Sequence, residues 1–131
     1  MKTLTCVAAL ALAACVMTGC GDRGAASADM VSGFRTAASS GDAVAQYNLG
    51  MCYARGVGVS QDMAEAVKWF RLSADQGHAA AQYELGACYL RGEGVPRDAA
   101  EAAKWFRLAA DQGNQLAQEA LKRLGGDVKA P

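Results

Sequence analysis

The sequence has little of what most enzymes and nucleic-acid-binding proteins use. Its 131 residues include one histidine, two prolines and nine aromatic side chains. Thirteen basic and thirteen acidic side chains give a formal net charge of zero, so no overall positive field attracts nucleic acid. The composition is 52% hydrophobic and rich in alanine, which favours closely packed helices over a sheet. We therefore expect one small all-α domain that does not bind nucleic acid.

The chain also lacks an apolar run long enough to span a membrane. Its longest run, residues 4–17, has 14 uncharged residues, whereas a spanning helix needs about 20. The run follows Lys2 and carries no polar stripe, which indicates a secretory signal peptide rather than a buried helix.

The signal peptide closes with Val-Met-Thr-Gly-Cys at residues 16–20, which resembles the lipobox of bacterial lipoproteins. The resemblance implies cleavage after residue 19 and a membrane anchor through lipidated Cys20, followed by a flexible tether over residues 20–29. Three acyl chains would make attachment effectively permanent. Gly21 follows the cysteine, which favours the outer membrane of a bacterial cell envelope, facing the periplasm. The alternative is ordinary cleavage at Ala26-Ser27-Ala28, which gives a secreted or soluble periplasmic protein.

The rest of the chain repeats itself with a period of 36 residues. Residues 45–80 align with residues 81–116, and 24 of the 36 aligned residues are identical. The period extends outward as a half repeat over residues 30–44 and a terminal helix over residues 117–124, before a disordered tail over residues 125–131. Such a period marks a solenoid, in which each unit buries its apolar face against its neighbours.

Each unit is expected to be a helix, a glycine-rich turn and a second helix, giving about six helices in all. Leu49, Cys52 and Tyr53 have the i, i+3, i+4 spacing of a helix face. Asp62 and Asp98 begin capping boxes at the second helices. Glycine at positions 41, 77 and 113 suits left-handed helix ends, after which residues 42, 78 and 114 start the next helix.

Two glycines lie inside predicted helices. Gly50 and Gly86 are equivalent by one period, and each costs about 1 kcal/mol relative to alanine. We infer that the paired second helix approaches too closely there for any side chain. One further period along stands Lys122, after which no second helix follows.

The pattern A-x-x-x-L-G-x-x-Y-x-x-G-x-G-V-x-x-D, present twice, resembles the Sel1-like repeat, a relative of the tetratricopeptide repeat. The resemblance implies a right-handed α/α solenoid that serves as a scaffold or adaptor for protein complexes. Secreted cysteine-rich members of that family carry a cysteine pair in each repeat. Here each full repeat has only Cys52 or Cys88, so that disulfide ladder is expected to be absent.

Cys52 and Cys88 are expected to be small apolar core residues. They occupy equivalent positions on stacked helices with axes about 8–10 Å apart, whereas a disulfide needs Cα atoms within about 7 Å. A disulfide or an intermolecular thiol is the alternative.

No catalytic set, metal ligands or cofactor site emerges, because His78 is interpreted as a capping or exposed residue. A solvated face is expected to hold Lys68, Arg71, Lys104 and Arg107.

Function is therefore expected to rest on a surface. The resemblance implies that first helices line a concave face, which carries Tyr47, Met51 and Arg55, then Tyr83, Ala87 and Arg91, then Glu119 and Arg123. Tyrosine and arginine are favoured at binding hot spots, and arginine grips a carboxylate with two donors. The alternative for Arg55 and Arg91 is helix C-terminal capping. Phe34 and Leu121 are expected to seal the open ends of the stack.

The leading hypothesis is an envelope-anchored, non-enzymatic module that binds a peptide or protein partner. One alternative is a hydrolase acting on a cell-wall or β-lactam substrate, as the family resemblance allows. Another alternative is an inhibitor or immunity-type binding protein.

Overall fold

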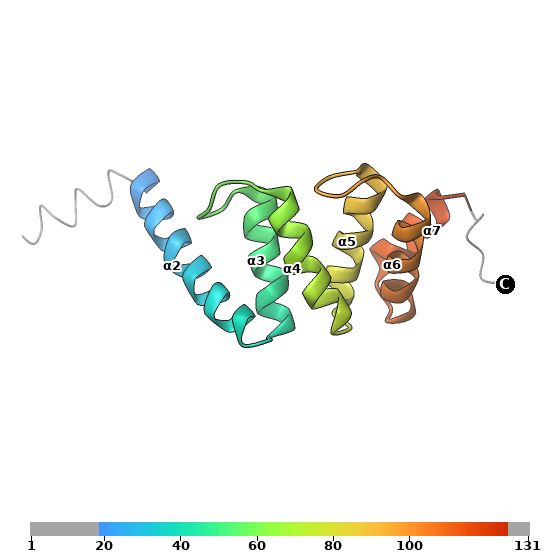
Figure 1. Ribbon diagram of the computed structural model, residues 1–131, viewed down its shortest axis with the longest axis horizontal. Coiled ribbons are helices and arrows are strands. Elements are labelled where there is room, and N and C mark those ends of the chain that lie inside the picture. The colour runs from blue at the N-terminus through green and yellow to red at the C-terminus, as the bar shows by residue number, and fades with distance from the viewer. Residues whose placement is uncertain (1–18, 126–131) are drawn as a thin grey trace, which may run out of the picture.

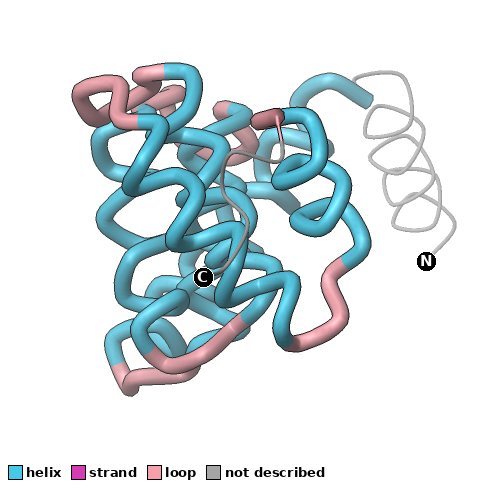
Figure 2. The backbone as a smooth tube through the Cα atoms, turned by 90° about the vertical axis from the view of Figure 1, so that its right-hand side faces the viewer, coloured by secondary structure: helices cyan, strands magenta, loops and turns pink. Residues whose placement is uncertain are grey.

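A computed structural model describes residues 19–125. They form six α-helices and no strand, which confirms the predicted all-α solenoid. The helices follow one another in chain order along the long axis of the molecule (Figure 1) and run between two ends where the connecting loops gather (Figure 2). Their bounds are α2 (Gly19–Ser39), α3 (Ala43–Arg55), α4 (Met63–Asp75), α5 (Ala79–Arg91), α6 (Ala99–Asp111) and α7 (Gln115–Arg123).

The start of α2 differs from expectation. Residues 20–29 were expected to be a flexible tether, but α2 begins at Gly19 and is continuous through them. Alanine at positions 25, 26 and 28 favours the helix. The loop between α3 and α4 also lies against it, because a β-carbon added at Gly58 would stand 2.5 Å from the Ser27 carbonyl oxygen. The expected signal peptide up to residue 18 and the tail beyond residue 125 lie outside the described residues.

The 36-residue period assigns each helix a place in a hairpin. Helices α3, α5 and α7 are first helices, and α2, α4 and α6 are second helices, so Phe34, Phe70 and Phe106 share one register position. Two complete hairpins, α3–α4 and α5–α6, therefore lie between an unpaired second helix and an unpaired first helix. The number of helices agrees with the predicted six.

Capping side chains fix most helix starts as the sequence predicts. Asp62 accepts a hydrogen bond from the Glu65 N–H at 3.1 Å, and Asn114 accepts one from the Ala117 N–H at 3.0 Å. His78 holds the equivalent place before α5, but its side chain makes no capping bond. Its ring lies 5.1 Å from the Tyr47 ring, centroid to centroid. The capping role is therefore wrong for the imidazole, which contacts an aromatic neighbour instead.

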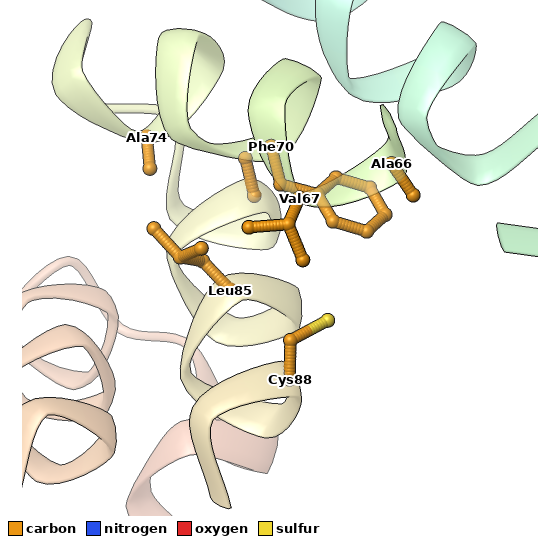
Figure 3. Close-up of a cluster of buried hydrophobic side chains, with 7 residues drawn as sticks. Ala66, Val67, Phe70, Ala74, Leu85 and Cys88 are labelled. Carbon is orange, nitrogen blue, oxygen red and sulfur yellow. The ribbon is translucent and has the colours of Figure 1, made fainter. Parts of the chain in front are cut away.

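The close helix approach inferred at the two internal glycines is confirmed. A β-carbon added at Gly50 would stand 2.7 Å from ring carbons of Phe70, and one at Gly86 would stand 2.8 Å from ring carbons of Phe106. Both rings are 1% exposed. Figure 3 shows how Phe70 and Val67 of α4 meet Leu85 and Cys88 of α5 in the core between hairpins.

Polar side chains also join successive repeats. Arg35 of α2 donates to the Tyr53 hydroxyl of α3 at 3.0 Å. One repeat later Arg71 of α4 donates to the Tyr89 hydroxyl of α5 and lies over its ring, 5.8 Å from the centroid. Arg71, although exposed, is therefore tied to the next hairpin, which corrects its assignment to a purely solvated face. Lys68 and Lys104 are exposed and pair with glutamates one helical turn earlier on the same helix, at 3.0 and 2.9 Å.

Candidate functional site

Three hollows lie along the first helices of the stack. The N-terminal hollow, of about 210 Å³, is lined mainly by α2 and α3. The central hollow, of about 490 Å³, lies between α3 and α5. The C-terminal hollow, of about 320 Å³, lies between α5 and α7. Neighbouring hollows share lining residues, so the three lie side by side, and the row that they make is named the groove.

Two arginines mark the borders between hollows. Arg55, the last residue of α3, lines the N-terminal and the central hollow. Arg91, the last residue of α5, lines the central and the C-terminal hollow. The Nη1 atom of Arg91 lies 3.9 Å from the Oε2 atom of Glu93. Arg55 has no ion-pair partner within 4 Å among the described residues. Both guanidinium groups are exposed and available for a ligand.

Met51 and Ala87 lie one helical turn before Arg55 and Arg91, and each of them is likewise shared between two neighbouring hollows. Met51 lines the first two hollows and Ala87 the last two. The groove therefore alternates an apolar position with a cationic one along α3 and along α5, whereas Arg123 of α7 stands at the position of Met51 and Ala87. Such a surface can hold the apolar side chains of an extended chain while the arginines bind carboxylates or backbone carbonyls.

Glu119 and Arg123 are brought together at the C-terminal hollow. Both lie on α7 and face the same space as Arg91 and the ring of Tyr83. Leu90, Leu116 and Leu124 complete its walls. This hollow therefore has largely apolar walls and carries charges only at Arg91, Glu119 and Arg123.

The two candidate tyrosines are placed differently from the arginines. The Tyr47 ring packs 6.0 Å from Phe70, and the Tyr83 ring packs 5.6 Å from Phe106, centroid to centroid. Burial is the main cause of the raised pKa of Tyr47, with a smaller contribution from Glu84. Tyr83 lines the C-terminal hollow, whereas Tyr47 lines none of the three described hollows. Tyr47 therefore belongs with the core more than with the groove.

Glu84 is a groove residue that the sequence did not reveal. It lines the central hollow together with Arg55 and Arg91. Burial raises the pKa of its carboxyl group, and the two arginines act in the opposite direction. The equivalent residues in the neighbouring repeats are Asn48 and Ala120, so no periodic signal marks this position.

The groove does not present an activated nucleophile. Cys88 lines the central hollow, but burial, and then Glu84 and Glu93, raise the pKa of its thiol to about 11. The thiol therefore stays protonated near neutral pH and is a poor nucleophile. Cys52 and Cys88 are both buried free cysteines, which confirms their prediction as core residues. Among residues 19–125, no cluster of three or more His, Cys, Asp or Glu side chains is arranged to hold a metal ion.

Comparison with known proteins agrees with the repeat geometry. The Sel1 repeat model matches residues 43–78 and 79–114, each of which contains one complete hairpin. The chain belongs to the Sel1 repeat family. Sel1 repeats generally act as protein-interaction modules, and the fold is typically a non-enzymatic scaffold.

Two solved structures with Sel1-like repeats are similar to this chain. One is c5321, a protective antigen present in uropathogenic Escherichia coli strains that displays an SLR fold, with 43% identity and a TM-score of 0.72 over 73% of this chain. The other is a Sel1 repeat protein from Oxalobacter formigenes, with 38% identity and a TM-score of 0.68 over 72% of this chain. The match spans 21% and 39% of those two chains, so this chain corresponds to a minor part of each.

A search of curated proteins found no match. None of the helices within residues 19–125 combines the length and apolarity needed to cross a bilayer.

Proposed function

We propose that this Sel1 repeat chain is an envelope-anchored interaction module that holds an extended segment of a partner protein in its groove. The observation that carries the proposal is the sharing of Arg55 and Arg91 between neighbouring hollows. An extended chain that follows the groove meets an arginine at each border and mainly apolar walls in the two outer hollows. Such alternation suits a peptide with acidic or carbonyl groups spaced between apolar side chains.

The anchoring part of the proposal rests on the lipobox-like sequence that ends at Cys20. A chain held by three acyl groups stays at the membrane surface and presents the groove to proteins of the periplasm. Labelled palmitate should be incorporated into the native chain and not into the Cys20→Ser variant. A mature chain that begins at Asp29, as seen by intact mass, would show ordinary signal cleavage and remove the anchor from the proposal.

The binding part is tested by affinity capture from crosslinked cell envelopes, with the captured proteins identified by mass spectrometry. If the arginines bind the partner, the double change Arg55→Ala and Arg91→Ala should weaken capture by about 3 kcal/mol or more, because truncating a hot-spot residue typically costs about 2 kcal/mol. The free energy of unfolding should change little. The matched control is Lys68→Ala with Lys104→Ala, which removes two exposed charges from the second helices and should leave capture intact.

The opposite result is equally informative. If Arg55 and Arg91 serve only the helix ends, the double variant should lose about 0.3–1 kcal/mol of stability per site while capture persists. Retained capture would move the binding surface away from the borders of the hollows. Turnover of a cell-wall substrate by the purified chain would overturn the adaptor function itself.

A further inference from the structure

The two ends of the stack are complementary halves of one hairpin. At the N-terminal end, α2 is a second helix without a first helix among the described residues, since residues 20–26, equivalent to the loop 56–62, are helical. At the C-terminal end, α7 is a first helix without a second helix among the described residues. If two copies met end to end, α7 of one and α2 of the other would occupy the places of a complete α/α hairpin.

The two complete hairpins show what such a joint requires. In both of them a phenylalanine ring of the second helix lies against a glycine of the first helix. A β-carbon at Gly50 or Gly86 would stand 2.7 or 2.8 Å from that ring and 3.2 or 3.1 Å from a backbone oxygen of the second helix. Those oxygens belong to Ala66 and Ala102, which are 0% exposed. A small residue on each side is therefore part of the repeat contact.

Both small residues are replaced at the ends of the stack. Lys122 of α7 stands at the position of Gly50 and Gly86, and Met30 of α2 stands at the position of Ala66 and Ala102. Phe34 of α2 is equivalent to Phe70 and Phe106, so the aromatic ring is retained at this end. It packs against the apolar cluster that α2 and α3 form. A joint between copies would bring Lys122 against Phe34 at a place that admits no β-carbon, and Met30 into a place that holds only a methyl group.

A third replacement, at the end formed by α2, removes an apolar packing contact. Trp69 and Trp105 pack against apolar clusters that each join the second helix of one unit to the first helix of the tryptophan's own hairpin. The equivalent residue of α2 is Gly33, and a β-carbon there would meet nothing within 4 Å. The N-terminal end therefore lacks the side chain that packs a second helix against such a cluster.

We propose that Met30, Gly33 and Lys122 close the two ends of the stack to a second copy of this chain. The fold supplies complementary ends, and these three residues keep one copy from extending another into a filament. Overpacking of a close helix contact and a buried ammonium group both oppose the joint. This inference is independent of the groove and of any partner bound there.

The test restores the repeat residues at both ends of the full chain. The variant that carries M30A, G33W and K122G should self-associate head to tail, with a dissociation constant lower than that of any wild-type self-association by about tenfold or more. Sedimentation velocity over a range of concentrations measures the assembly, and circular dichroism checks that each variant is folded. Should G33W prevent folding, the double variant M30A with K122G decides the matter.

Two controls show whether the association uses this joint. K122A in place of K122G should assemble much less, because the hairpins admit no β-carbon at that position. F34A added to the associating variant should disperse it. A folded triple variant that stays monomeric would overturn the proposal, as would association that neither K122A nor F34A weakens. Wild-type self-association that F34A abolishes would overturn it too, because the native ends would then already join.

Discussion

The side-chain amide of Gln76 donates a hydrogen bond to the Gln46 amide oxygen at 2.7 Å. Gln46 is buried and itself donates to the Ala38 carbonyl at 3.1 Å. One repeat later Gln112 donates to Gln82 at 2.8 Å, and Gln82 donates to the Ala74 carbonyl at 3.2 Å. These bonds form a polar ladder that connects each hairpin to the next and fixes their stacking.

We expect Gln82→Ala to lower the free energy of unfolding by about 1–3 kcal/mol, because it leaves buried polar groups without partners. Gln82 is 4% exposed, whereas the equivalent Gln118 of α7 is exposed and makes one bond, to the Ala110 carbonyl at 3.3 Å. Gln118→Ala should therefore cost about 0.5 kcal/mol or less. Urea denaturation of both variants measures the difference, and equal losses would contradict a stabilising role for the ladder.

Gly86→Ala should destabilise the protein although alanine is the better helix former. The added methyl group would meet the Phe106 ring at 2.8 Å, and overpacking typically costs about 1–3 kcal/mol. Gly33→Ala is the matched control within another helix, where nothing lies within 4 Å of the added carbon. That variant should gain roughly 0.5–1 kcal/mol. Thermal unfolding that moves both variants in the same direction would contradict the packing argument.

Glu84→Gln should stabilise the chain at neutral pH. The pKa of Glu84 is raised in the folded protein, chiefly by burial, so folding favours its protonated form. Its contribution to stability is therefore fully present below the ordinary pKa of 4.5 and is lost as the pH rises through the folded-state pKa. The gain from Glu84→Gln should be seen at pH 7 and vanish below pH 4.5. Glu119→Gln, on the exposed face of α7, is the control, and a gain independent of pH would contradict the titration.

The thiol of Cys88 should react slowly with iodoacetamide in the folded protein and quickly in urea. Burial and the neighbouring glutamates raise its pKa from 9.0 to about 11, so little thiolate is present at pH 8. The contribution of this protonated thiol to stability is lost as the pH rises from 9 toward 11. Mass spectrometry of timed alkylation follows the reaction at each cysteine. Rapid modification of Cys88 in the folded protein at pH 8 would contradict the raised pKa.

Features that recur with the period could be predicted from the sequence. The hairpin order, the capping by Asp62 and Asp98 and the tight contacts at Gly50 and Gly86 are each present twice. A recurrent residue reports a local geometry that the chain needs in every unit. The helical residues 20–26 had no such support, since their register equivalents form the loop in the full repeats.

The groove could be predicted only in part for the same reason. The positions of Arg55 and Arg91 follow from the register, but Glu84 has no acidic equivalent at Asn48 or Ala120. The contact of the His78 ring with Tyr47 depends on how two hairpins meet, and spacing along one helix does not contain that information. Residues that distinguish one hollow from the next are by their nature those that break the period.

The equivalence of Arg55 and Arg91 has a consequence for how a bound chain keeps its place. A carboxylate that moves along the groove by one repeat would exchange Arg55 for Arg91, so these two residues do not by themselves distinguish its two positions. Asn48, Glu84 and Ala120 present an amide, a carboxyl group and a methyl group in succession, and only one alignment matches all three. A position that differs in every repeat, as this one does, would fix how a chain bound in the groove is aligned.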